Sequence, residues 1–253
     1  MYLSCARPAM NEPSYCELRK GASGALPEKN SSFCVYVRTW YIFLMKRMGM
    51  SFVASSIGAP TNIAKLSNTF KSVKKVAISY NTIDKFLGYM QDAFIIEKAT
   101  RFDIKGKKYI GSLAKYYFTD MGLRNAVLGL RQQEESHIME NVIYNELRRR
   151  GCKVDVGIME QRYVSKDGKW QRKQLEVDFV VNEGSQKYYI QSALVMPDEE
   201  KRKQEMTSLL RIGDSFKKII IVKDDIKPWT DENGILTMGL MDFLMGDTKD
   251  LNI

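Results

Sequence analysis

The sequence predicts a mixed α+β protein, in which helices and a β-hairpin precede an α/β part. Apolar residues recur at helical spacing between residues 40 and 90, and two extended runs joined by a short basic turn follow them. Helix and strand patterns then alternate to the end of the chain. The length of 253 residues supports one large domain or two small ones, and 44% hydrophobic with 27% charged residues is usual for a globular protein.

Changes in composition divide the chain into three parts. Residues 1–35 contain three prolines and a Gly-Ala-Ser-Gly run at 21–24, so we expect an irregular N-terminal segment. The polar stretch 131–136 separates a first domain, residues 36–130, from a second, residues 131–253. No internal repeat or low-complexity tract is present.

The first domain has the outline of a winged helix-turn-helix, which is three helices followed by a basic β-hairpin. We expect helices over 40–56, from an N-cap at Thr61, and from an N-cap at Ser79. Strands are expected over 94–104 and 108–119, joined by Lys105-Gly106-Lys107, with a short helix over 120–129.

The net charge of +9 favours a polyanionic partner, either nucleic acid or an anionic membrane surface. Eleven Lys and Arg against four acids lie between Thr61 and Lys115, so much of the excess falls in the first domain. We expect double-stranded DNA as the partner, with the third helix in the major groove and lysines on phosphates. The candidate contacts are Lys74, Lys75, Tyr80, Asn81, Thr82, Lys85, Lys105, Lys107 and Lys108. A solvated helix face or a surface for another protein is the alternative.

In the second domain, the sequence pattern predicts helices over 137–150 and 197–210, with strands over 152–159, 161–165, 172–182, 187–195 and 217–223. In the tail, residues 234–243, it predicts a further strand and a turn of helix. A two-residue loop, Gly184-Ser185, predicts a type II′ hairpin, in which Asp178 lies opposite Gln191 and Glu176 opposite Ala193. Strand alternation then places these four on one face and the apolar set Val177, Phe179, Val181, Ile190 and Leu194 on the other.

An acidic helix (139–146), a strand with Asp and a strand expected to carry an acid-x-Lys element resemble the PD-(D/E)xK nucleases. The resemblance implies a restriction-endonuclease-like αβββαβ domain in which three acids bind a divalent metal and a Lys activates water. By position Glu140 and Asp178 match the first two acids, which makes them the candidate metal ligands. Gln191 occupies the position of the third acid, and Ala193 occupies the position of the catalytic Lys. Lys187 is expected on the same face but two residue pairs from Asp178, which is too far for it to replace the missing Lys. The resemblance therefore implies a remnant site without catalysis or cofactor, with Mg²⁺ expected only if the site is active.

A wider resemblance covers about residues 40–245. Segments 81–104, 116–125, 140–151, 176–181 and 189–191 are similar, in order and wording, to the C-terminal half of a bacterial and archaeal family of predicted AAA-type ATPases. That half is a winged helix followed by a nuclease-like domain of unknown function. The chain contains no G-x-x-x-x-G-K-[ST] motif, so we expect no ATP hydrolysis, and the first 35 residues suit a truncated or replaced N-terminus.

The four cysteines have neither zinc-site nor disulfide-framework spacing, and no secretory signal or membrane span is evident. We therefore expect a cytoplasmic protein with no membrane partner. The leading hypothesis is a non-catalytic DNA-associated protein. The alternatives are a Mg²⁺-dependent DNA nuclease, and an adaptor that binds another protein through its winged helix.

Overall fold

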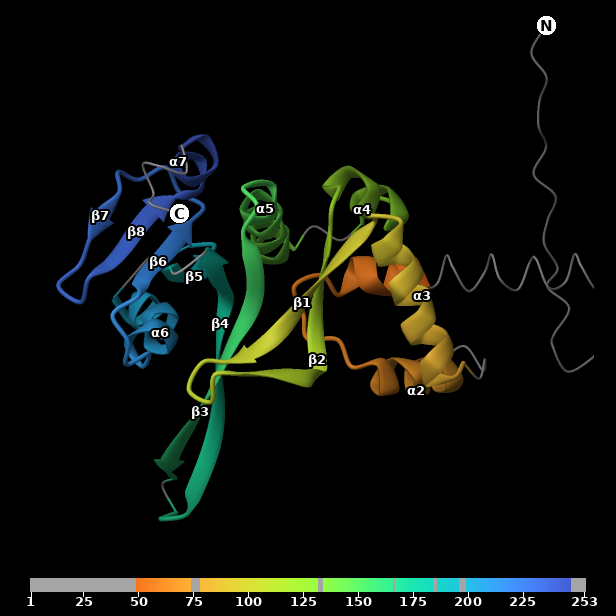
Figure 1. Cartoon of the computed structure of the whole chain (residues 1–253), viewed down its shortest axis with the longest axis horizontal. Coiled ribbons are helices and arrows are strands. Elements are labelled where there is room, and N and C mark those ends of the chain that lie inside the picture. The colour runs from red at the N-terminus through yellow and green to blue at the C-terminus, as the bar shows by residue number, and fades with distance from the viewer. Residues whose placement is uncertain are drawn as a thin grey trace, which may run out of the picture. The chain divides into compact units, whose positions relative to one another are not determined.

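The computed structural model describes residues 49–246, apart from 74–77, 132–133, 166, 184–185 and 196–198. One large mixed sheet organises this part of the chain, with strand order β2-β1-β3-β4-β5-β6-β8-β7 (Figure 1). The fold is thus mixed α+β, as predicted. The segment 1–35 and two candidate DNA contacts, Lys74 and Lys75, lie outside the described residues.

The elements follow the predicted order closely. Residues 49–55 are helical, in agreement with the end of the first expected helix. The helices are α2 (Ile63–Val73), α3 (Tyr80–Asp92), α4 (Met121–Val127), α5 (Glu135–Arg149), α6 (Glu199–Leu210) and α7 (Leu240–Met245). The strands are β1 (Ile96–Asp103), β2 (Lys108–Phe118), β3 (Lys153–Val164), β4 (Trp170–Glu183), β5 (Gln186–Ala193), β6 (Lys217–Val222), β7 (Trp229–Thr230) and β8 (Ile235–Gly239).

Local side-chain chemistry explains where two of the helices begin. The Ser79 side chain accepts a hydrogen bond from the Thr82 amide and caps α3, as predicted. At α2 the expected cap, Thr61, is wrong: Thr61 forms a bridge with Ala114 beside the sheet. Asn62 takes that role, because its Oδ1 accepts from the Lys65 amide. A second correction concerns β3, which is one continuous strand where two were expected.

The β1–β2 hairpin belongs to the large sheet rather than standing as a separate wing. β1 pairs with β2 on one side and, in parallel, with β3 on the other, where Arg101–Asp103 oppose Val156–Ile158. Strands from both sides of the expected boundary at residue 130 therefore share one sheet. The described residues, from 49 to 246, belong to one compact unit.

An irregularity in β4 decides which way its acidic side chains point. The β4–β5 register is the predicted one, because Phe179 opposes Ile190. Between β3 and β4, however, Asp155 opposes Val180 while Gly157 opposes Val177, so β4 carries one extra residue. Such a β-bulge reorients the side chains on either side of it. The predicted shared face of Val177 and Phe179 is consequently wrong, and these two residues lie in different core clusters.

The core lies on both faces of the sheet. One cluster packs α5 and α7, through residues such as Ile143, Leu147 and Phe243, against Phe179 and Ile190. The other packs α6 on the opposite face, through Met206 and Leu209, against strand residues that include Val177. Among the described residues, no helix is long and apolar enough to cross a membrane.

Candidate functional site

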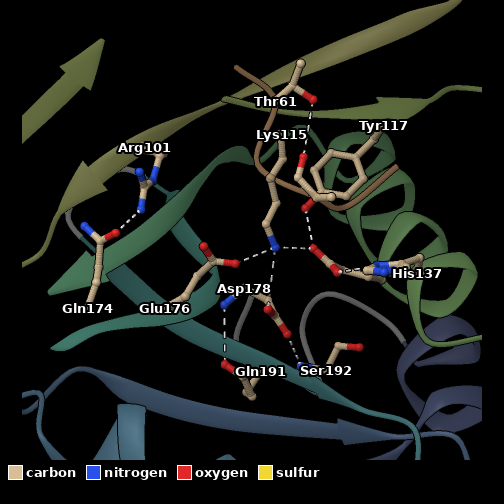
Figure 2. Close-up of polar contacts among 12 residues, drawn as sticks. Thr61, Arg101, Lys115, Tyr117, His137, Gln174, Glu176, Asp178, Gln191 and Ser192 are labelled. Carbon is tan, nitrogen blue, oxygen red and sulfur yellow. Dashed lines mark hydrogen bonds and ion pairs between the residues drawn. The ribbon is translucent and has the colours of Figure 1, made fainter. Parts of the chain in front are cut away.

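Lys115 of β2 is a buried lysine that sequence reasoning overlooked (Figure 2). It lies at the centre of an acidic cluster, which consists of Glu140, Glu176 and Asp178. Its Nζ is 2.8 Å from Glu140 Oε1 and 2.7 Å from Glu176 Oε1. Asp178 Oδ1 lies 3.9 Å from the same nitrogen. The Lys115 side chain is only 4% exposed. The expectation that the site lacks an amine is therefore wrong, because an element far away in the sequence supplies it.

Lys115 lies in strand β2, and the pairing of this strand with β1 sets its position. The residue lies in the apolar run Leu113–Phe118 and opposes Ala99 of β1. A charged side chain buried in such a run must find a partner of opposite charge, because an unpaired buried ammonium is strongly unfavourable. That mismatch is the signal in the sequence that could have identified Lys115.

Glu140 of α5 holds the cluster against the helix. Its Oε1 accepts hydrogen bonds from Lys115 Nζ, at 2.8 Å, and from the Tyr117 hydroxyl, at 2.6 Å. The His137 Nδ1 atom lies 3.8 Å from Oε2, which is too long for a hydrogen bond but close enough for electrostatic attraction when the imidazole is protonated. Gly58 also faces this carboxylate: a Cβ at that position, where φ is +68°, would come within 2.8 Å of Oε2. Protein atoms thus enclose Glu140 on several sides.

The bulge in β4 brings Asp178 to the same place. Its Oδ2 accepts a hydrogen bond from the Ser192 amide of β5 at 2.8 Å. Glu176, two residues earlier, reaches Lys115 and is 32% exposed, more than the other members of the cluster. The third carboxylate of the cluster is therefore Glu176, which strand alternation predicts on the face of Asp178 but to which the nuclease resemblance assigns no role.

Two residues expected beside Asp178 have other surroundings. Gln191 directs its Oε1 toward the Asp178 amide, at 3.4 Å, rather than completing the carboxylate cluster. Ala193 packs in the α6-side core cluster. The predicted face shared by Asp178, Gln191 and Ala193 is thus wrong, and the bulge is the reason. Lys187 lies over the rings of Phe102 and Phe216, so it does not join the acids either.

The charges of the cluster shift the pKa values of its members. Burial and the charge of Glu140 raise the pKa of Asp178 to about 7. Burial opposes ionisation of Glu140, but hydrogen bonding and the positive charge of Lys115 hold its pKa below the usual value. Burial disfavours the Lys115 ammonium as well, yet the charges of Glu140, Asp178 and Glu176 raise its pKa overall. The cluster therefore contains a firmly charged lysine and a carboxyl group that keeps its proton up to neutral pH.

The fit of this site to a divalent metal is poor. Mg²⁺ requires near-octahedral oxygen ligands at about 2.0–2.1 Å. Here the Lys115 ammonium lies between the carboxylates, and one oxygen each of Glu140 and Asp178 accepts a hydrogen bond from elsewhere in the protein. Within the described parts of the chain, no group of three or more His, Cys, Asp and Glu side chains is arranged to hold a metal. Glu140 and Asp178 are thus brought together, as expected, but around an ammonium.

The described candidates for DNA contact fall into two groups. Tyr80, Asn81, Thr82 and Lys85 are exposed on the first turns of α3, where the Thr82 hydroxyl also bonds to Ser79. Lys105, Lys107 and Lys108 are exposed around the turn between β1 and β2. That turn lies beside β3, since Ile104 donates to the Ile158 carbonyl, and Figure 1 places it away from α3. The two groups therefore do not form one continuous patch.

Comparisons with known proteins identify relatives without an assigned activity. Residues 45–134 match a family model described as a domain of unknown function, DUF8612. An uncharacterized protein of Haemophilus influenzae is 33% identical over 194 residues, which are 77% of this chain and 44% of that protein. The uncharacterized protein MJ1544 of Methanocaldococcus jannaschii is 31% identical over 143 residues, 56% of this chain and 29% of that protein. The chain thus spans less than half the length of these two relatives.

One similar solved structure is protein VC1899 from Vibrio cholerae, which is 12% identical to this chain. The superposition covers 79% of this chain and 52% of that one, with a TM-score of 0.30. A likeness this weak does not establish a shared fold.

Proposed function

We propose that this protein associates with DNA through its basic surfaces, and that its nuclease-like acidic cluster does not hydrolyse DNA. The position of Lys115 carries the second half of this proposal. Its ammonium makes short contacts with Glu140 and Glu176 in the space between the carboxylates. A divalent ion and an ammonium would compete for the same oxygen atoms, so the lysine blocks the cation that hydrolysis of a phosphodiester needs.

The cluster then has a structural role. Lys115 comes from β2, Glu140 from α5, and Glu176 and Asp178 from β4. A buried ion pair holds its two elements in one arrangement, because separating the partners leaves an uncompensated buried charge. The cluster therefore fixes the hairpin against the rest of the sheet.

Association with DNA follows from the charge. A net charge of +9, the exposed Lys85 on α3 and the exposed lysines at the β1–β2 turn favour a phosphate polymer. In this proposal α2, α3 and the hairpin act as a winged-helix-like element built into a nuclease-like sheet. Phosphate contacts of this kind supply affinity that does not depend on DNA sequence.

A Mg²⁺-dependent nuclease is the second candidate, and one observation favours it. Three carboxylates, Glu140, Glu176 and Asp178, meet one lysine, Lys115, which is the combination of residues that the nuclease resemblance requires. A bound divalent cation would polarise the phosphoryl oxygen and activate water. For this to happen, Lys115 would have to withdraw from Glu140 and Glu176.

A cleavage assay separates the two candidates. Supercoiled plasmid and short duplexes are incubated with the 253-residue chain in Mg²⁺, in Mn²⁺ and in EDTA, with Asp178→Asn as the matched variant. We expect no cleavage above the EDTA background in any sample. Metal-dependent cleavage that disappears in Asp178→Asn would overturn the non-catalytic proposal and establish the nuclease.

The DNA association is tested by fluorescence anisotropy with a labelled duplex across a salt series. The logarithm of the association constant should fall linearly with the logarithm of salt concentration, because binding releases counterions. Absence of binding at low salt, or binding that does not change with salt, would contradict the proposal.

A further inference from the structure

Strands β3 and β4 extend beyond the sheet as a two-stranded ribbon, here called the β-ribbon, formed by residues 159–164 and 170–175 (Figure 1). In the described part of the chain, β1 pairs with β3 only from Val156 to Ile158. β5 pairs with β4 only from Phe179 onward. The β-ribbon therefore has no neighbouring strand on either side, and the pairs from Met159↔Leu175 to Val164↔Trp170 are its own.

Cations dominate the exposed surface of the β-ribbon. Arg162 and Arg172 oppose each other across the two strands, and both are exposed. Lys169 and Lys173 are exposed nearby. The acids of this region are Glu160, 3.5 Å from Arg172, and Asp167 in the turn, so positive groups outnumber negative ones among the described residues. Two like charges in a cross-strand pair destabilise a sheet unless a partner of opposite charge binds them.

Aromatic side chains lie among these cations. Trp170 is 75% exposed although it is the largest apolar side chain of the β-ribbon, and Tyr163 is 38% exposed. Trp170 lies on the same strand as Arg172, two residues before it. It opposes Val164, which is two residues after Arg162 on the other strand. Arg162, Trp170 and Arg172 together line a shallow surface pocket. A flat ring and two guanidinium groups thus border one recess.

We propose that the β-ribbon is a nucleic-acid-binding arm, in which Arg162 and Arg172 bind phosphates and Trp170 stacks on an unpaired base. Guanidinium groups bind phosphate through paired N–H donors. An exposed ring beside a cationic strand is the arrangement that proteins use to bind single-stranded nucleic acid. The charge of the β-ribbon selects a polyanion, and the exposed ring selects one with accessible bases.

This inference rests on the proposed DNA association and assigns it to an element outside the predicted winged helix. It also distinguishes between surfaces, because the candidate lysines of α3 and of the β1–β2 turn lie elsewhere. The arm predicts a preference for single-stranded DNA, or for duplexes with a single-stranded end, over blunt duplexes.

The test measures binding of the 253-residue chain and its variants to labelled single-stranded and blunt duplex DNA by anisotropy. Arg162→Ala/Arg172→Ala should weaken single-strand binding by about tenfold or more and reduce the salt slope, since two phosphate contacts are lost. Lys105→Ala/Lys107→Ala removes the same number of charges from the competing surface at the β1–β2 turn, and it should weaken single-strand binding less than Arg162→Ala/Arg172→Ala does. Trp170→Ala should weaken binding by about tenfold without changing the salt slope, and Trp170→Phe should restore part of the affinity, because stacking does not depend on charge.

The outcomes separate the two proposals. Binding by the unaltered chain that both β-ribbon variants leave unchanged would overturn the arm and leave the DNA association standing. Binding that Lys105→Ala/Lys107→Ala weakens more than the β-ribbon variants do would also overturn the arm, in favour of the β1–β2 turn. No binding by the unaltered chain to either DNA would overturn both. Circular dichroism melting curves should match for all variants, because each altered side chain is exposed.

Discussion

Replacing Lys115 with methionine tests the acidic cluster most directly. Methionine keeps the length and the apolar stem of lysine but removes the ammonium. At an effective dielectric constant of about 20, a unit charge pair is worth roughly 6 kcal/mol at the 2.8 Å and 2.7 Å distances to Glu140 and Glu176. Burial of the ammonium, which is 4% exposed, cancels a large part of this attraction. The net loss on removing one partner of a buried pair is about 3–5 kcal/mol.

Urea unfolding followed by circular dichroism measures this loss. At pH 8, Lys115→Met should reduce the free energy of unfolding by about 3–5 kcal/mol, and the deficit should shrink at pH 5 as carboxylates take up protons. Lys108→Met is the matched control: this lysine lies on the same strand but is exposed, so its loss should cost less than about 0.5 kcal/mol. If the two variants lost equal stability, or if Lys115→Met lost less than about 1 kcal/mol, the cluster would not stabilise the packing of the β1–β2 hairpin against the rest of the sheet.

Three further changes probe the neighbourhood of this cluster. The pKa of Asp178 is raised from 3.8 in the unfolded chain to about 7, so the folded chain keeps a proton that the unfolded chain releases, and stability is lost as the pH rises from about 4 to 7. Asp178→Asn lacks this penalty and should be more stable than the unaltered chain by about 2–4 kcal/mol at pH 8, a gain that fades as the pH falls toward 4. A pH-independent difference in urea unfolding would contradict this. Asn141 is fully buried and bonds to both the amide and the carbonyl of Phe118, so Asn141→Ala should lower the free energy of unfolding by about 2–4 kcal/mol, whereas a loss below about 1 kcal/mol would mean that water replaces the amide. A Cβ on Gly157 would lie 2.7 Å from Val180 Cγ2, so Gly157→Ala should cost about 1–3 kcal/mol in thermal or urea unfolding, and an unchanged midpoint would show that the strands separate freely.

Periodicity and turn chemistry predicted most of the elements and one register. The pairing of Phe179 with Ile190 follows from a two-residue loop, and the cap at Ser79 follows from its place before a helical stripe. Both are local properties, because the atoms that determine them lie within a few residues of one another.

The cluster depended on features that local patterns do not contain. The extra residue of β4, between Val177 and Val180, follows from pairing with a separate strand, and it reverses the face on which Asp178 lies. Lys115 reaches the acids only because β1 pairs with β3 and brings β2 with it. A search for the amine near Gln191 and Ala193, where the resemblance placed it, could not find a residue from the other half of the chain.

The parallel pairing of β1 with β3 also affects how this protein can be divided. The segment that matches a domain model, residues 45–134, contains β1 and β2 but not β3. Expressed alone, it would expose the edge of β1, with the amide and carbonyl groups of Arg101–Asp103 open to solvent. Unpaired strand edges of this kind recruit strands from other molecules, so such a fragment is prone to self-association. Longer fragments that include Lys153–Val164 would keep this edge covered.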